Sequence, residues 1–371
     1  TYDGLVDDVQ AGSRILIDDG LIELQVKNKS GNEIVCTVIN GGELGERKGV
    51  NVPNVPVRLP AITEKDKEDI RFGVEQKIDF IAASFVRNAE CILEIKAYLK
   101  ELHAPYIPII AKIENAEGIQ NIDEIIRCAD GIMIARGDLG VEIPPENVPY
   151  LQKLIIQKCN DNYRPVITAT QMLDSMIRNP RPTRAEVTDV ANAVYDGTDA
   201  VMLSGETASG KYPLEALQMM VHIVENTEEH LDYDLIMRKA EEQRMKSTSS
   251  ALSHATVTTA NNLGAKCIIA PTASGATARV VSKFKPRTEI IGVTPNEEVM
   301  RRMQIYWGVR PLKSIEFTTT EDVCSGAIDL VVAKQIVETG DVVVLTAGIP
   351  SPHFSGQKEG VSNIMRIAVI Q

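Results

Sequence analysis

The sequence lacks paired cysteines and metal-binding histidine motifs. Its six cysteines are widely scattered, and no two of them have the Cys-x-x-Cys spacing of a zinc knuckle. Its five histidines do not form a His-Glu-x-x-His motif. These absences argue against a structural zinc site and against a disulfide framework. We therefore expect mostly buried, free thiols and a location in the reducing cytoplasm.

Long apolar runs and an excess of basic charge are also missing. No apolar stretch approaches the length of a membrane span, and the first ten residues are too acidic and polar for a signal peptide. The 39 Lys and Arg residues are outnumbered by 51 Asp and Glu residues, which gives a net charge of −12. General binding to nucleic acid needs clustered cations, so we expect none. A local cationic site for a small anionic substrate is still allowed.

The composition that is present, 44% hydrophobic and 24% charged residues, is typical of a soluble globular protein. The length of 371 residues predicts two or three domains. Residues 1–56 contain three segments of alternating apolar and polar residues, at 13–18, 21–26 and 33–40, separated by turn signals. This pattern predicts a small β module. Three prolines within 51–60 predict a linker that leaves it.

From Ile62 onward, short apolar runs alternate with helical patterns. The predicted strands are 80–86, 107–113, 131–135, 165–169 and 200–203; helices are predicted at 89–102, at 148–160 and after a capping box at 183–186. Repeated strand–helix units indicate parallel strands with crossover helices. A (β/α)8 barrel needs eight such units, whereas an open doubly wound sheet needs only five. The spacing alone leaves these two folds undecided.

The last third of the chain reads as a second α/β segment. A charged stretch at 225–250 predicts helix at a domain boundary, and apolar runs follow at 267–270, 290–293, 342–345 and 364–370.

The most informative chemistry lies at 109–115, where a buried strand ends in two charges. Lys112 and Glu114 are two residues apart, so on a strand they face the same side. They also lie at the carboxyl end of the strand, where active sites form in parallel α/β folds. A purely structural ion pair is an equal alternative at this point.

The next two strand ends add polar groups. Gly137 and Asp138 follow the strand at 131–135, and Thr170 follows the strand at 165–169. Glu114 and Asp138 on neighbouring strands suit Mg²⁺, which takes few protein oxygens. Gly137 allows a ligand to approach the backbone closely. The hydroxyl of Thr170 suits either a substrate contact or a helix cap.

Two further loops carry phosphate-binding patterns. The loop with Thr272, Ser274, Gly275 and Thr277 lies between a strand and a helix, which suits an anion or an ordinary capped loop. The segment 205–211 imitates a P-loop, but Tyr212 stands where a Ser or Thr would bind Mg²⁺, so we reject that reading.

The chain resembles the pyruvate kinase family over essentially its whole length. The motifs that carry the resemblance occur in the family's order: KGVNVP at 48–53, LPAITEKD at 59–66, KIEN at 112–115, ARGDLG at 135–140, TATQML at 168–173, NPRPTRAE at 179–186 and MLSGETA at 202–208. The resemblance implies a partial β lid domain at 1–56, strands 4–8 of a (β/α)8 barrel at 57–228, and a C-terminal α/β regulatory domain at 229–371.

The resemblance also implies site residues, cofactors and partners. The implied activity is phosphoryl transfer from phosphoenolpyruvate to ADP, giving pyruvate and ATP in glycolysis, with Mg²⁺ (or Mn²⁺) and K⁺. Lys112 would stabilise the transferring group and the enolate, and Thr170 would help to protonate the enolate. The remaining implied contacts are the substrate carboxylate at Gly137, Mg²⁺ at Glu114 and Asp138, nucleotide phosphates at Lys48, an effector phosphate at Thr272, Ser274, Gly275 and Thr277, and a homotetramer contact near 178–186.

The resemblance also has a departure. At about 30 residues per βα unit, roughly 90 residues of the family's barrel would precede this sequence, with an Arg and the K⁺ ligands among them. We therefore expect the chain by itself to have very weak or no kinase activity. The alternatives are a truncated, inactive fragment that only binds an effector or other ligand, and another Mg²⁺-dependent enolate enzyme on a barrel.

Overall fold

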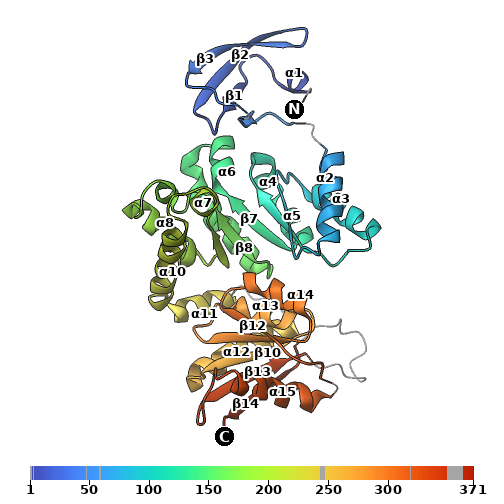
Figure 1. The fold of residues 1–371 in the computed structure, drawn as a ribbon, viewed down its shortest axis with the longest axis vertical. Helices are drawn as coiled ribbons and strands as arrows, with labels where there is room; N and C mark the ends of the chain where they lie inside the picture. The colour runs from blue at the N-terminus through green and yellow to red at the C-terminus, as the bar shows by residue number, and fades with distance from the viewer. Residues whose placement is uncertain are drawn as a thin grey trace. The chain divides into compact units, whose positions relative to one another are not determined.

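A computed structural model of the protein describes residues 2, 4–46, 48–57, 60–242, 247–317, 319–348 and 362–371 (Figure 1). The chain divides into two compact units. The first comprises Thr1–Asp196 and Val201–Val224, and the second comprises Gly197–Ala200 and Glu225–Gln371. Among the described residues, no helix is both long and apolar enough to cross a membrane. The predicted domain boundaries stay predictions.

The first unit begins with the predicted β module. A four-stranded sheet has the order β3-β2-β1-β4, and its neighbouring strands are antiparallel. The bounds are α1 Leu5–Asp8, β1 Arg14–Ile17, β2 Ile22–Ser30, β3 Glu33–Asn40 and β4 Val50–Asn51. The predicted turn at Asp18, Asp19 and Gly20 has three consecutive positive φ values, which is why short polar residues and glycine occur there.

The linker prediction for 51–60 is wrong at its start. Asn51 belongs to β4 and pairs with Leu16 of β1, so the β module extends further along the chain than its alternating pattern. A two-residue strand carries no periodic signal, because its pairing depends on the open edge of β1. Arg58 and Leu59, later in the predicted linker, lie outside the described residues.

The five predicted strands of the next segment are confirmed. They form one sheet in the order β5-β6-β7-β8-β9, and β5 to β8 pair in parallel. The bounds are β5 Ile81–Ala83, β6 Ile109–Ile113, β7 Gly131–Ala135, β8 Val166–Ala169 and β9 Ala200–Met202. Sequential order means that each crossover proceeds in the same direction, as in a barrel, whereas an open doubly wound sheet reverses.

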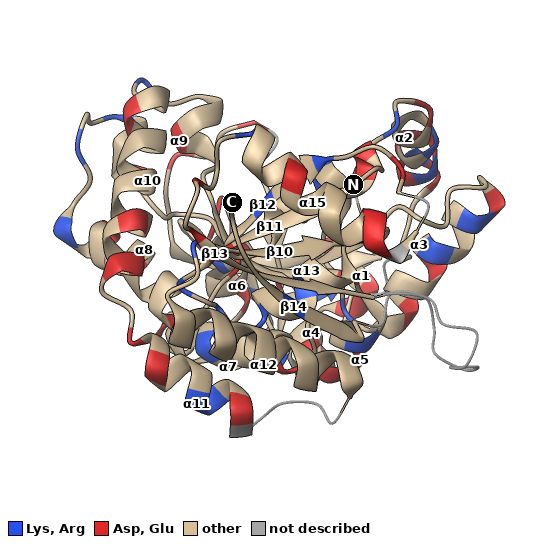
Figure 2. Cartoon of the chain, turned by 90° about the horizontal axis from the view of Figure 1, so that it is seen from below, with Lys and Arg blue, Asp and Glu red and all other residues tan. Residues whose placement is uncertain are grey.

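Helices connect these strands and enclose two apolar clusters, one around β5 to β8 and one between η2, α8 and α10. Their bounds are α2 Glu64–Glu75, α3 Ala89–Glu101, α4 Ala116–Gln120, α5 Ile122–Cys128, α6 Arg136–Glu142, η1 Pro145–Asn147, α7 Val148–Asp161, η2 Asp174–Ile177, α8 Arg184–Asp196, α9 Gly205–Ala208 and α10 Pro213–Glu229. Helix α2 begins with a complete capping box, in which Thr63 and Asp66 each accept from the other's main chain. Helices such as α3 carry both acidic and basic residues (Figure 2).

The second unit contains a five-stranded sheet of order β12-β11-β10-β13-β14, parallel except for β14. Its elements are α11 Tyr233–Glu242, α12 Thr248–Leu263, β10 Cys267–Pro271, α13 Ala276–Ser282, β11 Glu289–Thr294, α14 Glu297–Arg302, η3 Met303–Ile305, β12 Val309–Lys313, α15 Thr320–Ala333, β13 Val342–Ala347 and β14 Ile364–Val369. The chain order reverses between β10 and β13, where open α/β sheets bind ligands. The sequence pattern missed β12, whose residues are only partly buried and include Arg310 and Lys313.

The prediction of mostly buried, free thiols is confirmed. All six cysteines are free, and Cys91, Cys159, Cys267 and Cys324 are buried. Burial raises the pKa of the Cys267 thiol to about 12. The single tryptophan, Trp307, is 7% exposed. It lies in the second unit, with the Nζ atom of Lys285 5.0 Å from its ring centroid.

Neighbouring positions of α3 provide a test of the core. Ile92 is fully buried, whereas Leu93 is 51% exposed. We expect Ile92→Ala to lower the free energy of unfolding by about 2–5 kcal/mol, because it leaves a cavity. Leu93→Ala should change it by no more than about 0.5 kcal/mol. Urea denaturation followed by far-ultraviolet circular dichroism measures both, and equal effects would contradict the assigned orientation of α3.

Candidate active site

Charged and polar side chains gather at the carboxyl edge of the β5–β9 sheet. Each successive strand end contributes: Ser84 and Phe85 after β5, Lys112 and Glu114 at β6, Arg136 to Asp138 after β7, Thr170 after β8 and Glu206 after β9. Because carboxyl ends of parallel strands meet at one edge, residues 29 and 33 positions apart in sequence form hydrogen bonds there, Phe85 with Glu114 and Leu173 with Glu206.

The Lys112–Glu114 pair forms as predicted. The Nζ atom of Lys112 lies 2.6 Å from Oε1 of Glu114, so both side chains point to the same side of β6. The Lys112 side chain is 24% exposed, whereas that of Glu114 is 1% exposed. The Glu114 carboxylate is therefore a buried charge, and its partner, the Lys112 ammonium group, lies at the rim of the site, closer to solvent. This geometry fits both a structural ion pair and a site that holds a cationic group towards a ligand.

Two residues that the sequence analysis missed complete this pair. The main-chain N–H of Phe85 donates to Oε2 of Glu114 at 2.5 Å, and Nζ of Lys112 donates to Oγ of Ser84 at 2.8 Å. Phe85 has a φ of 52° and a side chain that is 54% exposed. A large exposed aromatic in a left-handed conformation is uncommon. The detectable signal was Ser84 itself, a hydroxyl directly after an apolar strand.

Asp138 lies in the first turn of α6 and is half-buried. Burial raises the pKa of Glu142, one turn further on, and the charge of Asp138 raises it again. Negative charge is thus concentrated at this turn, which a bound cation would relieve.

The carboxylates fit a magnesium ion. Glu114 has two contacts, whereas a carboxylate offers about four lone-pair sites, so it retains capacity to bind a cation. Among the residues that the structure describes, no group of three or more His, Cys, Asp and Glu side chains is arranged to hold a metal. Mg²⁺ needs no such group, since it commonly binds one or two carboxylates together with substrate phosphates and water.

The structure brings Gly137 and Thr170 together. The main-chain N–H of Gly137 donates to Oγ1 of Thr170 at 2.7 Å, and Oγ1 donates to the carbonyl oxygen of Ala169 at 2.6 Å. A Cβ atom added at Gly137 would lie 3.4 Å from Oγ1, a distance of ordinary contact. The hydroxyl of Thr170 therefore bridges the ends of β7 and β8. Because Gly137 lies in the first turn of α6, the hydroxyl also satisfies an N-terminal donor of that helix, so the helix-cap alternative from sequence is met in part, by a helix that precedes Thr170 in the chain.

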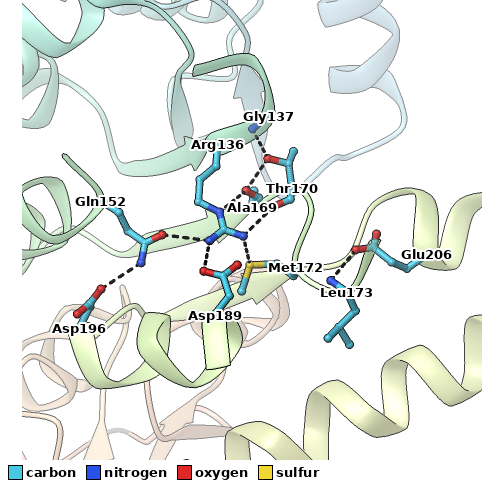
Figure 3. A network of polar contacts seen from close by, with 10 residues as sticks. All are labelled: Arg136, Gly137, Gln152, Ala169, Thr170, Met172, Leu173, Asp189, Asp196 and Glu206. Carbon is cyan, nitrogen blue, oxygen red and sulfur yellow. Dashed lines mark hydrogen bonds and ion pairs between the residues drawn. The ribbon is translucent and has the colours of Figure 1, made fainter. Parts of the chain in front are cut away.

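Arg136 and Glu206 are two further residues that the sequence analysis did not single out (Figure 3). The side chain of Arg136 is 10% exposed and that of Glu206 1% exposed. Both contact the segment that carries Thr170. Arg136 lies in the motif at 135–140 and Glu206 in the motif at 202–208. Nothing in the local sequence, where each is a charged residue next to a glycine, indicates that its side chain is buried.

The predicted capping box at Thr183 and Glu186 is confirmed and extends beyond α8. The carboxylate of Glu186 accepts from the main chain and hydroxyl of Thr183 and also from those of Ser175. Burial raises the pKa of Glu186, but these hydrogen bonds outweigh it, so the net shift is downward. Glu186 thereby ties η2 to the start of α8.

This lowered pKa predicts a pH dependence. A carboxyl whose pKa is lower in the folded state stabilises the fold above its unfolded pKa of about 4.3, and that contribution is lost as the pH falls through the folded value. We expect Glu186→Gln to cost about 1 kcal/mol at pH 7. The difference from the unaltered protein should vanish in more acidic solution. Thermal unfolding across pH measures it, with Glu101→Gln as the control for an exposed carboxylate; a pH-independent difference would contradict the assignment.

The predicted nucleotide contact, Lys48, lies in the β module. Its Nζ atom is 2.9 Å from Oδ1 of Asp18, and this hydrogen bond raises the pKa of Lys48. The side chain is 40% exposed. Its role in binding phosphate stays a prediction.

The predicted effector loop follows β10 at the point where the strand order reverses. Oγ1 of Thr272 accepts from the main-chain N–H of Gly275 at 2.9 Å, which closes the loop before α13. Ser274 is exposed, whereas Thr277 is buried and bonded to Ser362 at 3.2 Å. The structure thus brings these residues into one loop but turns Thr277 inward. Residues 349–356, in the loop after β13, lie outside the described residues. Effector binding stays a prediction.

Comparison with known proteins matches both units. A family profile described as "Pyruvate kinase, barrel domain" matches residues 1–217, and one described as "Pyruvate kinase, alpha/beta domain" matches residues 250–368. The chain belongs to the pyruvate kinase family. The resemblance seen in the sequence motifs is therefore confirmed, as is the α/β fold with a parallel sheet.

Individual relatives match over the whole of this chain. A protein of Geobacillus stearothermophilus named pyruvate kinase is 53% identical, and one of Clostridium acetobutylicum with the same name is 48% identical. A pyruvate kinase of Staphylococcus epidermidis is 51% identical. The chain spans 62%, 77% and 63% of the length of these three relatives, respectively.

Proposed function

We propose that the protein transfers the phosphoryl group of phosphoenolpyruvate to ADP, giving pyruvate and ATP. The observation that carries the proposal is the placement of two bonded pairs, Lys112 with Glu114 and Gly137 with Thr170, at the ends of three successive strands. The chain's relatives are named pyruvate kinases across its full extent. Because of those names, phosphoryl transfer is preferred to the alternative of a chain that only binds an effector.

Each residue has a physical task in this reaction. The ammonium group of Lys112, held at the rim by Glu114 and Ser84, faces the charge that develops on the transferring phosphoryl group and on the enolate oxygen. The backbone at Gly137 receives the substrate carboxylate. The hydroxyl of Thr170 lies in the same hydrogen-bonded chain and helps to bring a proton to the enolate carbon.

We propose that Glu114 and Asp138 hold Mg²⁺. When bound, the ion would neutralise negative charge on the phosphoryl oxygens, which is the main requirement of phosphoryl transfer. Glu114 is a fixed ligand, since its burial and its bond from Phe85 leave it one orientation. Asp138 sits at the start of α6, where a carboxylate is favoured by the helix dipole. Mn²⁺ would serve in place of Mg²⁺, and K⁺ is proposed from the family alone.

A coupled assay on the purified protein tests the proposal. It measures ATP formed from phosphoenolpyruvate and ADP with Mg²⁺ and K⁺ present, alongside the intact mass of the protein. We expect phosphoenolpyruvate-dependent ATP formation, because the relatives that match the whole of this chain are named pyruvate kinases; this replaces the expectation from sequence of very weak or no activity. Lys112→Met should lower kcat by about 100- to 1000-fold, as expected for loss of one preorganised charge.

Lys96→Met is the matched control for Lys112→Met. Lys96 also belongs to a lysine–carboxylate pair, with Nζ 3.1 Å from Asp130 and 2.7 Å from the carbonyl oxygen of Cys128. That pair precedes β7, at the opposite edge of the sheet. Equal loss of activity in both variants would contradict a catalytic role for Lys112, and no ATP formation by the unaltered protein would overturn the proposed function.

Asp138→Asn tests the metal assignment. We expect the Mg²⁺ concentration that gives half-maximal activity to rise by at least about tenfold, because an amide is a much weaker ligand than a carboxylate. Mn²⁺ affinity, followed by electron paramagnetic resonance, should fall in parallel. Asp123→Asn is the control, since its carboxylate is 61% exposed and pairs with Lys158 on the helices. An unchanged Mn²⁺ affinity in the Asp138 variant would contradict the assignment of Asp138 as a metal ligand.

We also propose contacts outside this edge. Lys48 would contact the nucleotide phosphates, and the loop at Thr272–Gly275 would receive an effector phosphate, with exposed Ser274 at its tip. A homotetramer with a contact near 178–186 is proposed from the family, and analytical ultracentrifugation measures it.

A further inference from the structure

The segment that carries Thr170 has an unusual backbone. Thr170 has a φ of 69° and Gln171 a φ of 53°, so two consecutive residues with side chains adopt the left-handed conformation. For a β-branched residue such as threonine this conformation is a genuine outlier. It persists only where the surrounding structure over-determines it.

Arg136 holds the first half of this segment (Figure 3). Its Nη2 atom donates to the carbonyl oxygen of Thr170 at 2.9 Å and contacts the sulfur of Met172 at 2.8 Å, while Nε lies 3.4 Å from the carbonyl oxygen of Ala169. Two carbonyl oxygens and one sulfur of the segment therefore contact the same planar guanidinium group.

The charge of Arg136 is itself held in place. Its Nη1 atom donates to Oδ1 of Asp189 at 2.7 Å and lies 3.3 Å from Oε1 of Gln152, and Gln152 donates in turn to Asp196. These partners come from α7 and α8, outside the sheet edge. A lysine at this position has one point charge and no fork, so it would not satisfy the same set of acceptors.

Glu206 holds the other half of the segment. Its Oε1 atom accepts from the main-chain N–H of Leu173 at 3.1 Å, and its Oε2 atom accepts from the N–H of Ser204 at 2.7 Å and from its hydroxyl at 3.3 Å. Each oxygen is thus an acceptor, and the side chain is 1% exposed. The carboxylate fixes the end of the segment to the loop that follows β9.

We propose that Arg136 and Glu206 are positioning residues that hold the strained segment 169–173, so that the hydroxyl of Thr170 stays against the amide of Gly137. The inference rests on the proposed function, in which Thr170 acts on the enolate carbon. In that step the phosphorus–oxygen bond has broken and ADP holds the phosphoryl group. The carbon–carbon π pair of the enolate then forms a C–H bond with a proton that the Thr170 hydroxyl passes on and regains from solvent, and the enolate oxygen becomes the carbonyl oxygen of pyruvate.

The proposal separates the two halves of the reaction. Protonation depends on the exact place of the Thr170 hydroxyl, whereas the proposed nucleotide contact, Lys48, pairs with Asp18 in the β module and not with segment 169–173. The variants should therefore lower kcat and leave the KM for ADP nearly unchanged. By microscopic reversibility they should also slow exchange of the pyruvate methyl hydrogens with solvent deuterium.

The experiment compares Arg136→Met, Arg136→Lys and Glu206→Gln in the purified protein. Proton nuclear magnetic resonance in D₂O follows methyl exchange of pyruvate with Mg²⁺ and ATP present. We expect Arg136→Met and Glu206→Gln to lower the exchange rate by about 100-fold, the usual scale of a positioned proton-transfer group. Arg136→Lys should recover only part of this loss. Glu206→Gln is informative because an amide nitrogen would face an N–H donor on one side.

Arg164→Met is the matched control. Arg164 precedes β8 at the opposite end of the same strand, and its guanidinium also donates to two carbonyl oxygens, those of Ile126 and Arg127, both at 3.1 Å. This variant should lower stability without changing methyl exchange per folded molecule. Equal losses from Arg164→Met and Arg136→Met would overturn the inference.

Amide hydrogen exchange read by mass spectrometry gives a readout that needs no turnover. The peptide that contains 169–173 should exchange faster in the Arg136 and Glu206 variants and not in Arg164→Met. If the unaltered protein makes no ATP, the proposed function fails, and this arm still decides whether the two side chains hold the segment. If the unaltered protein is active and the variants match it in both kinds of exchange, the inference is wrong.

Discussion

Buried charge at the carboxyl edge of the β5–β9 sheet has to be matched, and the matching groups are largely main-chain ones. Glu114 accepts from the amide of Phe85, Arg136 donates to the carbonyl of Thr170, and Glu206 accepts from the amide of Leu173. An unmatched buried charge costs far more than a surface pair contributes. The conformations of the loops after β5 and β8 are therefore set by charges that neighbouring units of the sheet carry. The positions of the proposed reacting groups at this edge therefore depend on several neighbouring strand–helix units together.

The strands and their order of appearance were predictable because their signal is local. Apolar runs such as those of β7 and β10 are buried along their whole length, and the two-residue spacing of Lys112 and Glu114 decides which way their side chains point. The capping boxes of α2 and α8 were equally readable, since both partners lie within one turn. Local chemistry also identified Gly137 and Thr170, although only the folded structure connects them.

What the sequence did not reveal depends on contacts between distant segments. Strand β4 forms by pairing with the open edge of β1. Strand β12 has no apolar run or regular alternation that would predict a strand. Arg136 and Glu206 are charged residues, which are exposed in most proteins. Their burial depends on partners that include distant ones, such as Asp189, 53 positions from Arg136, and Leu173, 33 positions from Glu206. No periodicity or spacing rule contains that information.

The single tryptophan has a spectroscopic consequence. Trp307 is buried in the second unit with the ammonium group of Lys285 over its ring, whereas the first unit contains only tyrosine and phenylalanine as fluorophores. Indole emission selected by red-edge excitation therefore follows the second unit alone. A nearby cation shifts the energy of the excited indole dipole, so loss of the Lys285 contact should change the emission colour as well as its intensity. Tyrosine emission, in contrast, comes from both units, since Tyr233 and Tyr306 lie in the second, so the indole signal alone can be assigned to one unit.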